Sequence, residues 1–315
     1  MIERIRWLAK KNGRGTLIHG IGDDCAILHV PRSRQLLATT DLSIEDVHFR
    51  RKWHSARSVG HRCLARGLSD IAAMGGEPLA CFLSLGVPPR LRQKWVDEFL
   101  RGLLALAHRF KIPLAGGDTS SAQKITADIL VLGTVPRGKA LLRSGARPDD
   151  RIYVTGKLGG SAAVLKRLYA GEKPDAAKAR SHFYPEPRIE LARRLRELKL
   201  ATAMIDLSDG LSVDLAHICQ ESRVSAVIEA KAIPIASGAM LDLALHGGED
   251  YELLFTASAK AEVPAEIAGV RVTHIGNTLP RSSRASLIQI RDAMGHTKPV
   301  EQAGWQHFAK NITSR

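Results

Sequence analysis

The sequence predicts an α+β protein with two domains. Segments with strand-like and helix-like periodicity alternate along the chain, which favours a fold that mixes helices with sheets. The length of 315 residues is about twice that of a typical domain. Hydrophobic residues make up 44% and charged residues 25%, which is the balance of a globular protein rather than a disordered or fibrous one.

The expected elements follow from local apolar patterning. Short apolar runs predict strands at residues 35–40, 80–85, 125–135, 152–155, 201–205, 225–229 and 251–256. Longer amphipathic stretches predict helices at residues 56–74, 91–110, 161–169, 188–198 and 211–221. The second of these helices is the clearest, because Leu91, Trp95, Leu103, Leu106 and Phe110 recur near helical spacing.

A domain boundary is expected after the strand at residues 125–135. The sequence PRGKALLRSGARPDD combines proline, glycine and charge between two strand-like runs, as a linker does. We therefore expect an N-terminal domain at residues 1–142 and a C-terminal domain at residues 143–315.

The net charge of 46 − 32 = +14 raises the question of an anionic partner. Residues 151–200 carry 12 Lys and Arg against 5 Asp and Glu, whereas residues 201–250 carry 2 against 8. The basic stretch 188–199 admits a nucleic-acid-binding module, although a solvated helix face is the simpler explanation. We therefore expect no nucleic-acid partner. No apolar run is long enough to span a bilayer, so we also expect no membrane partner and a cytoplasmic location.

Glycine-flanked aspartates are the chemical signal of this chain. The sequence has no G-x-x-x-x-G-K-[ST] and no kinase signature, so any nucleotide is held in another way. Aspartates beside glycines or at the ends of predicted strands occur in Gly22-Asp23-Asp24, Thr39-Thr40-Asp41, Gly116-Gly117-Asp118 and Asp206-Leu207-Ser208-Asp209-Gly210, and Asp70 in Leu68-Ser69-Asp70 adds a fifth motif. Several carboxylates in one cleft repel one another, and Mg²⁺ removes that repulsion while bridging to phosphates.

Each of these features also has a structural explanation. A single glycine–aspartate pair forms a turn, Ser208 and Asp209 can cap the helix near Leu211, and the acids around Glu249 can lie in a solvated hairpin. His48 is an isolated histidine. Trp305 is either a core residue or a stacking surface for a ligand ring. Five motifs of the same kind in one chain favour the functional explanation.

The motifs together resemble thiamine-monophosphate kinase. The segments that carry the resemblance are GIGDDCAIL, TTDLSIEDVHF, LSDIAAMGGEP, GGDTS, RSGARPDD, VTGKLGGSAA, IDLSDGL and GGEDYELLF, and they cover nearly the whole chain in the family's order. The resemblance implies the two-domain fold of aminoimidazole ribonucleotide synthetase, with the N-terminal domains pairing strands across a homodimer. It also implies an ATP site that uses several Mg²⁺ ions.

The resemblance assigns residues to roles. It implies metal ligands at Asp24, Thr39, Thr40, Asp41, Asp70, Asp118, Asp206 and Asp209. It implies ATP contacts at Gly117, Asp118, Arg143 and Ser208, and thiamine-phosphate contacts at His48, Glu249 and Trp305. Two positions depart from the family pattern: Gly67 replaces an asparagine, and Ser121-Ala122 replaces an Arg-Gly pair, which removes a cation from the loop.

The expected reaction is phosphorylation of thiamine phosphate by ATP through direct in-line transfer. No protein nucleophile is expected, because a phosphate monoester is mostly a dianion at pH 7 and attacks without a general base. Mg²⁺ ions would neutralise both phosphates. The alternative within enzymes is a relative that uses the same ATP cleft on another acceptor.

Overall fold

The computed structural model describes residues 2–9, 17–19, 21, 25–282 and 286–304. The chain forms two compact units: Met1–Ala140 with Lys173–Arg196, and Leu141–Glu172 with Glu197–Arg315. A single boundary at residue 142 would assign residues 173–196 to the second domain, whereas the structure groups them with the first unit. Each unit has its own sheet with helices, which confirms the α+β class.

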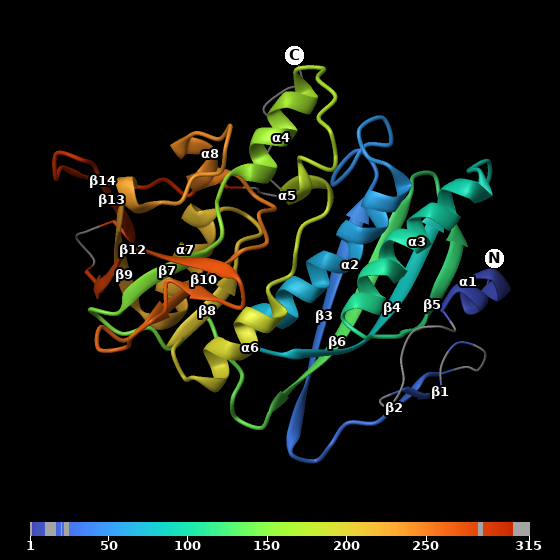
Figure 1. Ribbon diagram of the computed structural model, residues 1–315, viewed down its shortest axis with the longest axis horizontal. Coiled ribbons are helices and arrows are strands. Elements are labelled where there is room, and N and C mark those ends of the chain that lie inside the picture. The colour runs from blue at the N-terminus through green and yellow to red at the C-terminus, as the bar shows by residue number, and fades with distance from the viewer. Residues whose placement is uncertain (1, 10–16, 20, 22–24, 283–285, 305–315) are drawn as a thin grey trace. The chain divides into compact units, whose positions relative to one another are not determined.

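The first unit is built on a four-stranded sheet of order β3-β6-β4-β5, in which only β4 and β5 are parallel. Helices α2 and α3 lie along one face of this sheet (Figure 1). The elements before the segment 173–196 are α1 (Ile2–Ala9), β1 (Leu17–His19), β2 (Ile27–Leu28), β3 (Arg34–Ile44), α2 (Ala56–Ala73), β4 (Glu77–Val87), α3 (Gln93–Arg109), β5 (Leu114–Ser121) and β6 (Thr126–Pro136).

The core of this unit lies between the two helices and the sheet. Leu64 and Leu68 of α2 and Leu103 of α3 are fully buried, as are the inward residues Ile129 and Val131 of β6. The period of α2 and α3 is helical and that of β6 is two, so each element presents one apolar stripe to the same interior. Burial of these stripes stabilises the unit.

Residues 173–196 return from the second half of the chain to α2 and α3. This segment contains α5 (Arg180–Phe183) and the start of α6 (Ile189–Glu197). His61 Nε2 is 2.8 Å from the carbonyl oxygen of Pro185, and Arg62 donates to the carbonyl of His182. Arg109 donates to Glu186 at 2.6 Å. These contacts fix the returning segment on the first unit.

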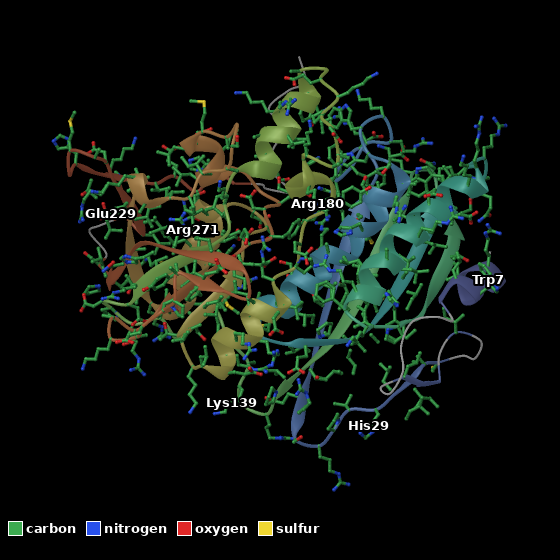
Figure 2. The ribbon with its side chains drawn as sticks, in the orientation of Figure 1. Trp7, His29, Lys139, Arg180, Glu229 and Arg271 are labelled. Carbon is green, nitrogen blue, oxygen red and sulfur yellow. The ribbon has the colours of Figure 1, made fainter. Side chains whose placement is uncertain are left out.

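The second unit contains a larger sheet of order β14-β13-β9-β12-β7-β10-β8, with β11 paired to β12. Only β9 and β13 pair in parallel. At the end of β9, Glu229 (labelled in Figure 2) accepts a hydrogen bond from Arg291 of β13 at 2.7 Å. The elements are β7 (Arg151–Thr155), α4 (Gly160–Tyr169), β8 (Ala203–Asp206), α7 (Leu211–Ser222), β9 (Val224–Glu229), η1 (Ala230–Ala232), α8 (Leu241–His246), β10 (Leu253–Ala257), β11 (Glu266–Ile267), β12 (Val270–Pro280), β13 (Ile288–Arg291) and β14 (Thr297–Pro299).

Buried apolar side chains of β7, β8 and β10 pack with those of α7 in the core of the second unit, including Val154, Ile205, Leu215 and Leu254. No helix in the described part of the chain combines the length and apolar character that crossing a membrane requires.

Close packing of α2 on α3 requires two glycines. A Cβ atom on Gly102 would lie 1.9 Å from the carbonyl oxygen of Arg57, and one on Gly60 would lie 1.9 Å from that of Phe99. Both distances are far below van der Waals contact, so each helix backbone occupies the space of a side chain on the other.

We expect Gly102→Ala to lower the free energy of unfolding by about 2 kcal/mol, because the steric clash outweighs the gain of about 1 kcal/mol in helix propensity. Ala105 lies on the exposed side of the same helix and provides the control. Ala105→Gly measures propensity alone and should cost about 1 kcal/mol. Denaturant titrations of both variants check this, and a Gly102→Ala protein as stable as the wild type would contradict it.

Candidate functional site

In the first unit, three predicted residues meet where β3 faces α2. Thr39 and Asp41 alternate along β3 with Thr40 between them, so they share one face of the sheet. The hydroxyl of Thr39 donates a hydrogen bond to the carboxylate of Asp70 on α2. Arg66, one turn earlier on α2, lies 3.7 Å from Asp41. The β3 strand and α2 therefore bring together Thr39, Asp41 and Asp70.

The electrostatics of this cluster oppose ionisation of Asp41. The pKa of Asp41 is raised to about 6, chiefly by burial; Arg66 opposes the shift, and the carboxylates of Asp70 and Asp128 contribute to it. A cation among these carboxylates would relieve the repulsion, and their hard oxygen atoms are the ligands that Mg²⁺ prefers. The donor chemistry of this cluster fits the metal that the resemblance implies.

Thr40 and Asp118 lie on the other face of the same sheet. Thr40 pairs with Leu130 of β6, while Asp118 of β5 is in register with Ser84 of β4, which is itself in register with Asp128. Paired residues on neighbouring strands share a face, so these side chains alternate with those of Thr39 and Asp41. Asp118 accepts a hydrogen bond from the amide of Thr119 at 2.7 Å.

Gly117, a predicted ATP contact, lies where β5 approaches β4 most closely. Its φ is +141°, and a Cβ atom there would lie 1.8 Å from the carbonyl oxygen of Leu83. Only glycine fits this backbone, and the glycine sets the path of the chain into Asp118.

In the second unit, the loop between β8 and α7 carries the remaining predicted aspartates. Asp206 ends the fully buried strand β8, and its side chain is buried. The amides of Asp209 and Gly210 both donate to Oδ2 of Asp214 at 3.1 Å. Gly210 has a φ of +114° and directly precedes α7. Asp214 thus fixes the loop by accepting amides that the start of α7 would otherwise leave unpaired.

This loop concentrates negative charge. The pKa of Asp214 is raised to about 8, chiefly by burial; the carboxylates of Asp206 and Asp209 contribute to the shift, and the two amide hydrogen bonds oppose it. Three carboxylates and the N-terminus of a helix therefore lie together. Such an arrangement accommodates a cation at the acids and phosphate oxygens at the amides.

The loop at residues 247–252 is joined to the loop at residues 207–210 by main-chain hydrogen bonds. Glu249 donates its amide to the carbonyl of Ser208 at 2.7 Å, Tyr251 donates to that of Leu207 at 2.9 Å, and Leu207 donates to that of Glu252 at 2.8 Å. The predicted ATP contact Ser208 and the predicted substrate contact Glu249 are therefore neighbours.

The other predicted residues fall in separate places. The carbonyl of Arg143 accepts the hydroxyl of Ser222 at 2.9 Å, and the Arg143 guanidinium adds to the burial that lowers the pKa of His217 on α7. His48 accepts the amide of Ile44 on its Nδ1 at 3.0 Å, so its ring also stabilises a local turn.

Asp24 and Trp305 lie outside the described residues. The residue before Trp305 is described: a Cβ atom on Gly304 would lie 2.3 Å from the carbonyl oxygen of Asp209. The chain therefore passes directly beside the loop at residues 207–210 immediately before the predicted aromatic contact.

Across the described residues, no three histidine, cysteine or acidic side chains are positioned to hold one metal ion together. The predicted metal ligands divide instead into three groups: Thr39, Asp41 and Asp70 where β3 faces α2, Thr40 and Asp118 on the other face of that sheet, and Asp206 and Asp209 after β8. Asp128, which raises the pKa of Asp41, and Asp214, which lies with Asp206 and Asp209, were missed by sequence reasoning. Asp128 lies inside a predicted strand and Asp214 inside a predicted helix, and neither belongs to one of the five motifs that drew attention to the others.

Gly67, which departs from the family pattern, lies where α2 packs closely on β6. A Cβ atom on Gly67 would lie 2.6 Å from Cγ2 of Val131, so the glycine lets α2 lie close to β6. Ser121 ends β5 in register with Val87 and is exposed.

Two family models match this chain, one on each side of the segment between residues 135 and 147. Residues 22–135 match the family model of the AIR synthase related protein, N-terminal domain, and residues 147–285 match that of the C-terminal domain. A structure of hydrogenase maturation protein HypE from E. coli has a TM-score of 0.78 at 16% identity and covers 95% of this chain and 97% of its own, which shows the fold alone. The fold is thus that of the AIR synthase related proteins.

Closer relatives specify the family. Thiamine-monophosphate kinase from Salmonella typhimurium is 38% identical over 92% of both chains, and that from Bacillus subtilis is 33% identical over 92% of this chain and 93% of its own. The crystal structure of thiamine-monophosphate kinase from Stenotrophomonas maltophilia has a TM-score of 0.81 at 34% identity, covering 91% of this chain and 94% of its own. The chain belongs to the thiamine-monophosphate kinase family.

We expect Asp214→Asn to leave the metal-free protein as stable as the wild type or more stable at pH 7.5. One amide oxygen can accept both hydrogen bonds that Oδ2 accepts, and the neutral amide replaces a carboxyl group that is already mostly neutral at pH 7.5, because its pKa is raised to about 8. Asp214→Ala leaves two amides unpaired and should cost roughly 1–3 kcal/mol. Thermal melts in EDTA compare the two, and equal destabilisation by both substitutions would contradict this account.

Proposed function

We propose that this protein transfers the γ-phosphoryl group of ATP to thiamine phosphate, forming thiamine diphosphate and ADP. The observation that carries the proposal is the full-length similarity to thiamine-monophosphate kinases, together with the acid-rich loops that the two units present at the matching motifs. A related structure, AaThiL complexed with AMPPCP and TMP, has a TM-score of 0.78 at 30% identity and covers 89% of both chains.

The chemistry of the residues supports direct transfer. The acceptor phosphate is mostly a dianion at neutral pH, so the main obstacle is repulsion between two anionic groups. Amides at the start of α7 and the basic side chain of Arg143 offer positive potential to phosphate oxygens. Ser208 and Glu249, joined through the main chain, would contact the nucleotide and thiamine phosphate respectively.

Mg²⁺ is the cofactor that the donor set fits. Asp41, Asp70, Asp206 and Asp209 supply hard carboxylate oxygens. Burial is the main cause of the raised pKa values of Asp41 and Asp214, and neighbouring carboxylates add a repulsion that a divalent cation would relieve. When bound, the metal would neutralise phosphate charge. Asp24, Thr39, Thr40 and Asp118 complete the proposed ligand set, and Gly117 and Asp118 the ATP contacts. His48 and Trp305 complete the contacts to thiamine phosphate.

A homodimer in the cytoplasm is part of the proposal. The sheet face opposite α2 and α3 carries Leu36 and Leu42, which are 51% and 49% exposed, and the half-buried Phe82, Leu130 and Leu132. An apolar face of this kind is typical of a surface that another protein surface covers. A second copy of the chain, pairing through the same face, is the occupant we propose.

The test of the activity is to incubate the protein with ATP, Mg²⁺ and thiamine phosphate and to quantify thiamine diphosphate and ADP. We expect both products in equal amounts and neither in EDTA. Asp70→Asn and Asp206→Asn should each lower turnover by at least about 100-fold, because each removes a proposed metal ligand from its own unit. Asp292→Asn, in a hairpin turn that asparagine also forms, is the control and should keep full activity.

Formation of ADP without thiamine diphosphate would show a working ATP site that serves another acceptor. Near-normal turnover in both Asp70→Asn and Asp206→Asn, with circular dichroism unchanged, would contradict the assigned roles of these carboxylates.

The dimer is tested with lysine on the apolar face. Leu36→Lys should raise the dimer dissociation constant by at least about tenfold, since the interface would bury an unpaired charge. Leu142, 48% exposed on the second unit, gives the matched control, and Leu142→Lys should leave the dimer intact. Light scattering across a concentration series measures both. A wild-type monomer at all concentrations would refute the dimer.

A further inference from the structure

Asp250 is a buried carboxylate that the predicted reaction does not use. It lies in the loop at residues 247–252, is 9% exposed, and comes directly after Glu249, the proposed substrate contact. Its two oxygens point at the start of α4: Oδ2 accepts the amide of Gly159 at 2.6 Å and Oδ1 accepts that of Ser161 at 3.2 Å. Helix α4 has no side-chain cap from its own N-cap residue, Gly159. Asp250 therefore caps this helix from a residue about ninety positions away.

The glycine-rich start of α4 has the sequence of an anion-binding turn. Free amides at the N-terminus of a helix favour a phosphate or a carboxylate. Here the protein's own carboxylate takes that place, since Asp250 accepts amide hydrogens with both of its oxygens. The turn thus serves to fix the loop that carries Asp250.

The backbone on either side of Asp250 is strained. Glu249 has a φ of +65° and Tyr251 a φ of +51°, which are left-handed conformations that L-residues adopt at a cost in free energy. Such conformations persist where surrounding contacts fix them. Main-chain hydrogen bonds to Ser208 and Leu207 fix one side of the loop. The hydrogen bonds that Asp250 accepts from the start of α4 fix the other side.

We propose that Asp250 is a positioning residue that orients Glu249 toward thiamine phosphate. The inference rests on the proposed function. A second anchor serves the neighbouring loop: Asp214 accepts the amides of Asp209 and Gly210. The proposed nucleotide contact at Ser208 therefore keeps its own support when Asp250 is changed. Loss of the Asp250 contacts should weaken binding of thiamine phosphate and spare that of MgATP.

Asp250→Asn is the informative substitution. Asparagine keeps the size of the side chain but has one acceptor oxygen, and its amino group would face an amide hydrogen of α4. The matched control is Asp150→Asn. Asp150 is also buried in the second unit, accepts the amide of Arg147 and the hydroxyl of Thr202, and lies at the opposite end of β8 and β10.

We expect Asp250→Asn to raise the KM for thiamine phosphate by at least about tenfold, with kcat and the KM for MgATP changed by less than roughly threefold. Asp150→Asn should change none of the three. In a double-mutant cycle with Glu249→Gln, the two effects should not add, because Asp250 acts through Glu249. Equal rises in both KM values, a loss confined to kcat, or full additivity would overturn the proposal.

A second readout does not need activity. Hydrogen exchange followed by NMR should show the amides of Gly159 and Ser161 protected in the wild type and exchanging at least about tenfold faster in Asp250→Asn, but not in Asp150→Asn. Unchanged protection would show that Asp250 does not hold the start of α4 through these hydrogen bonds. A wild-type protein that shows this protection but forms no thiamine diphosphate would refute the proposed function, while the hydrogen bonds between Asp250 and α4 would remain supported.

Discussion

Repulsion among closely placed carboxylates is the constraint on which both acid-rich regions depend. In the first unit it acts between Asp41 and Asp70, and in the second it acts among Asp206, Asp209 and Asp214. A fold that only had to be stable would not retain such groups, because burial and like charge both raise their free energy. Their presence is explained by the work that carboxylates do for a phosphate-transferring enzyme.

Two buried acids of the second unit are held by backbone amides rather than by basic side chains. Asp214 accepts two amides at the start of α7, and Asp250 accepts two at the start of α4. Amide hydrogens are fixed by the helix, whereas a lysine or arginine would also neutralise the charge that a metal needs. Arg66, at 3.7 Å from Asp41, is a long contact and leaves that carboxylate's pKa raised.

The sequence predicted those parts of the fold whose signals are local. The strands at β3, β4 and β6 and the helices α2, α3 and α7 have clear apolar periods, and the structure contains them within a few residues of the expected bounds. It did not predict β5, whose sequence LAGGDTSS is poor in strand-forming residues, because that strand forms by pairing with β4. Nor could it show that residues 173–196 return to the first unit, which depends on contacts such as that of His61 with Pro185.

In the candidate site too, residues in local motifs were predicted, whereas residues whose role depends on the folded chain were not. Motif resemblance found the acids that glycines flank, since those glycines mark unusual backbone such as that of Gly117 and Gly210. It did not find Asp214, which accepts amides from the loop just before it, or assign a role to Asp250, which accepts amides from about ninety positions away. A motif records which side chains face a ligand, whereas hydrogen-bond partners far apart in the chain decide how those side chains are held. Orientation of the substrate contacts is therefore a property that only the folded chain reveals.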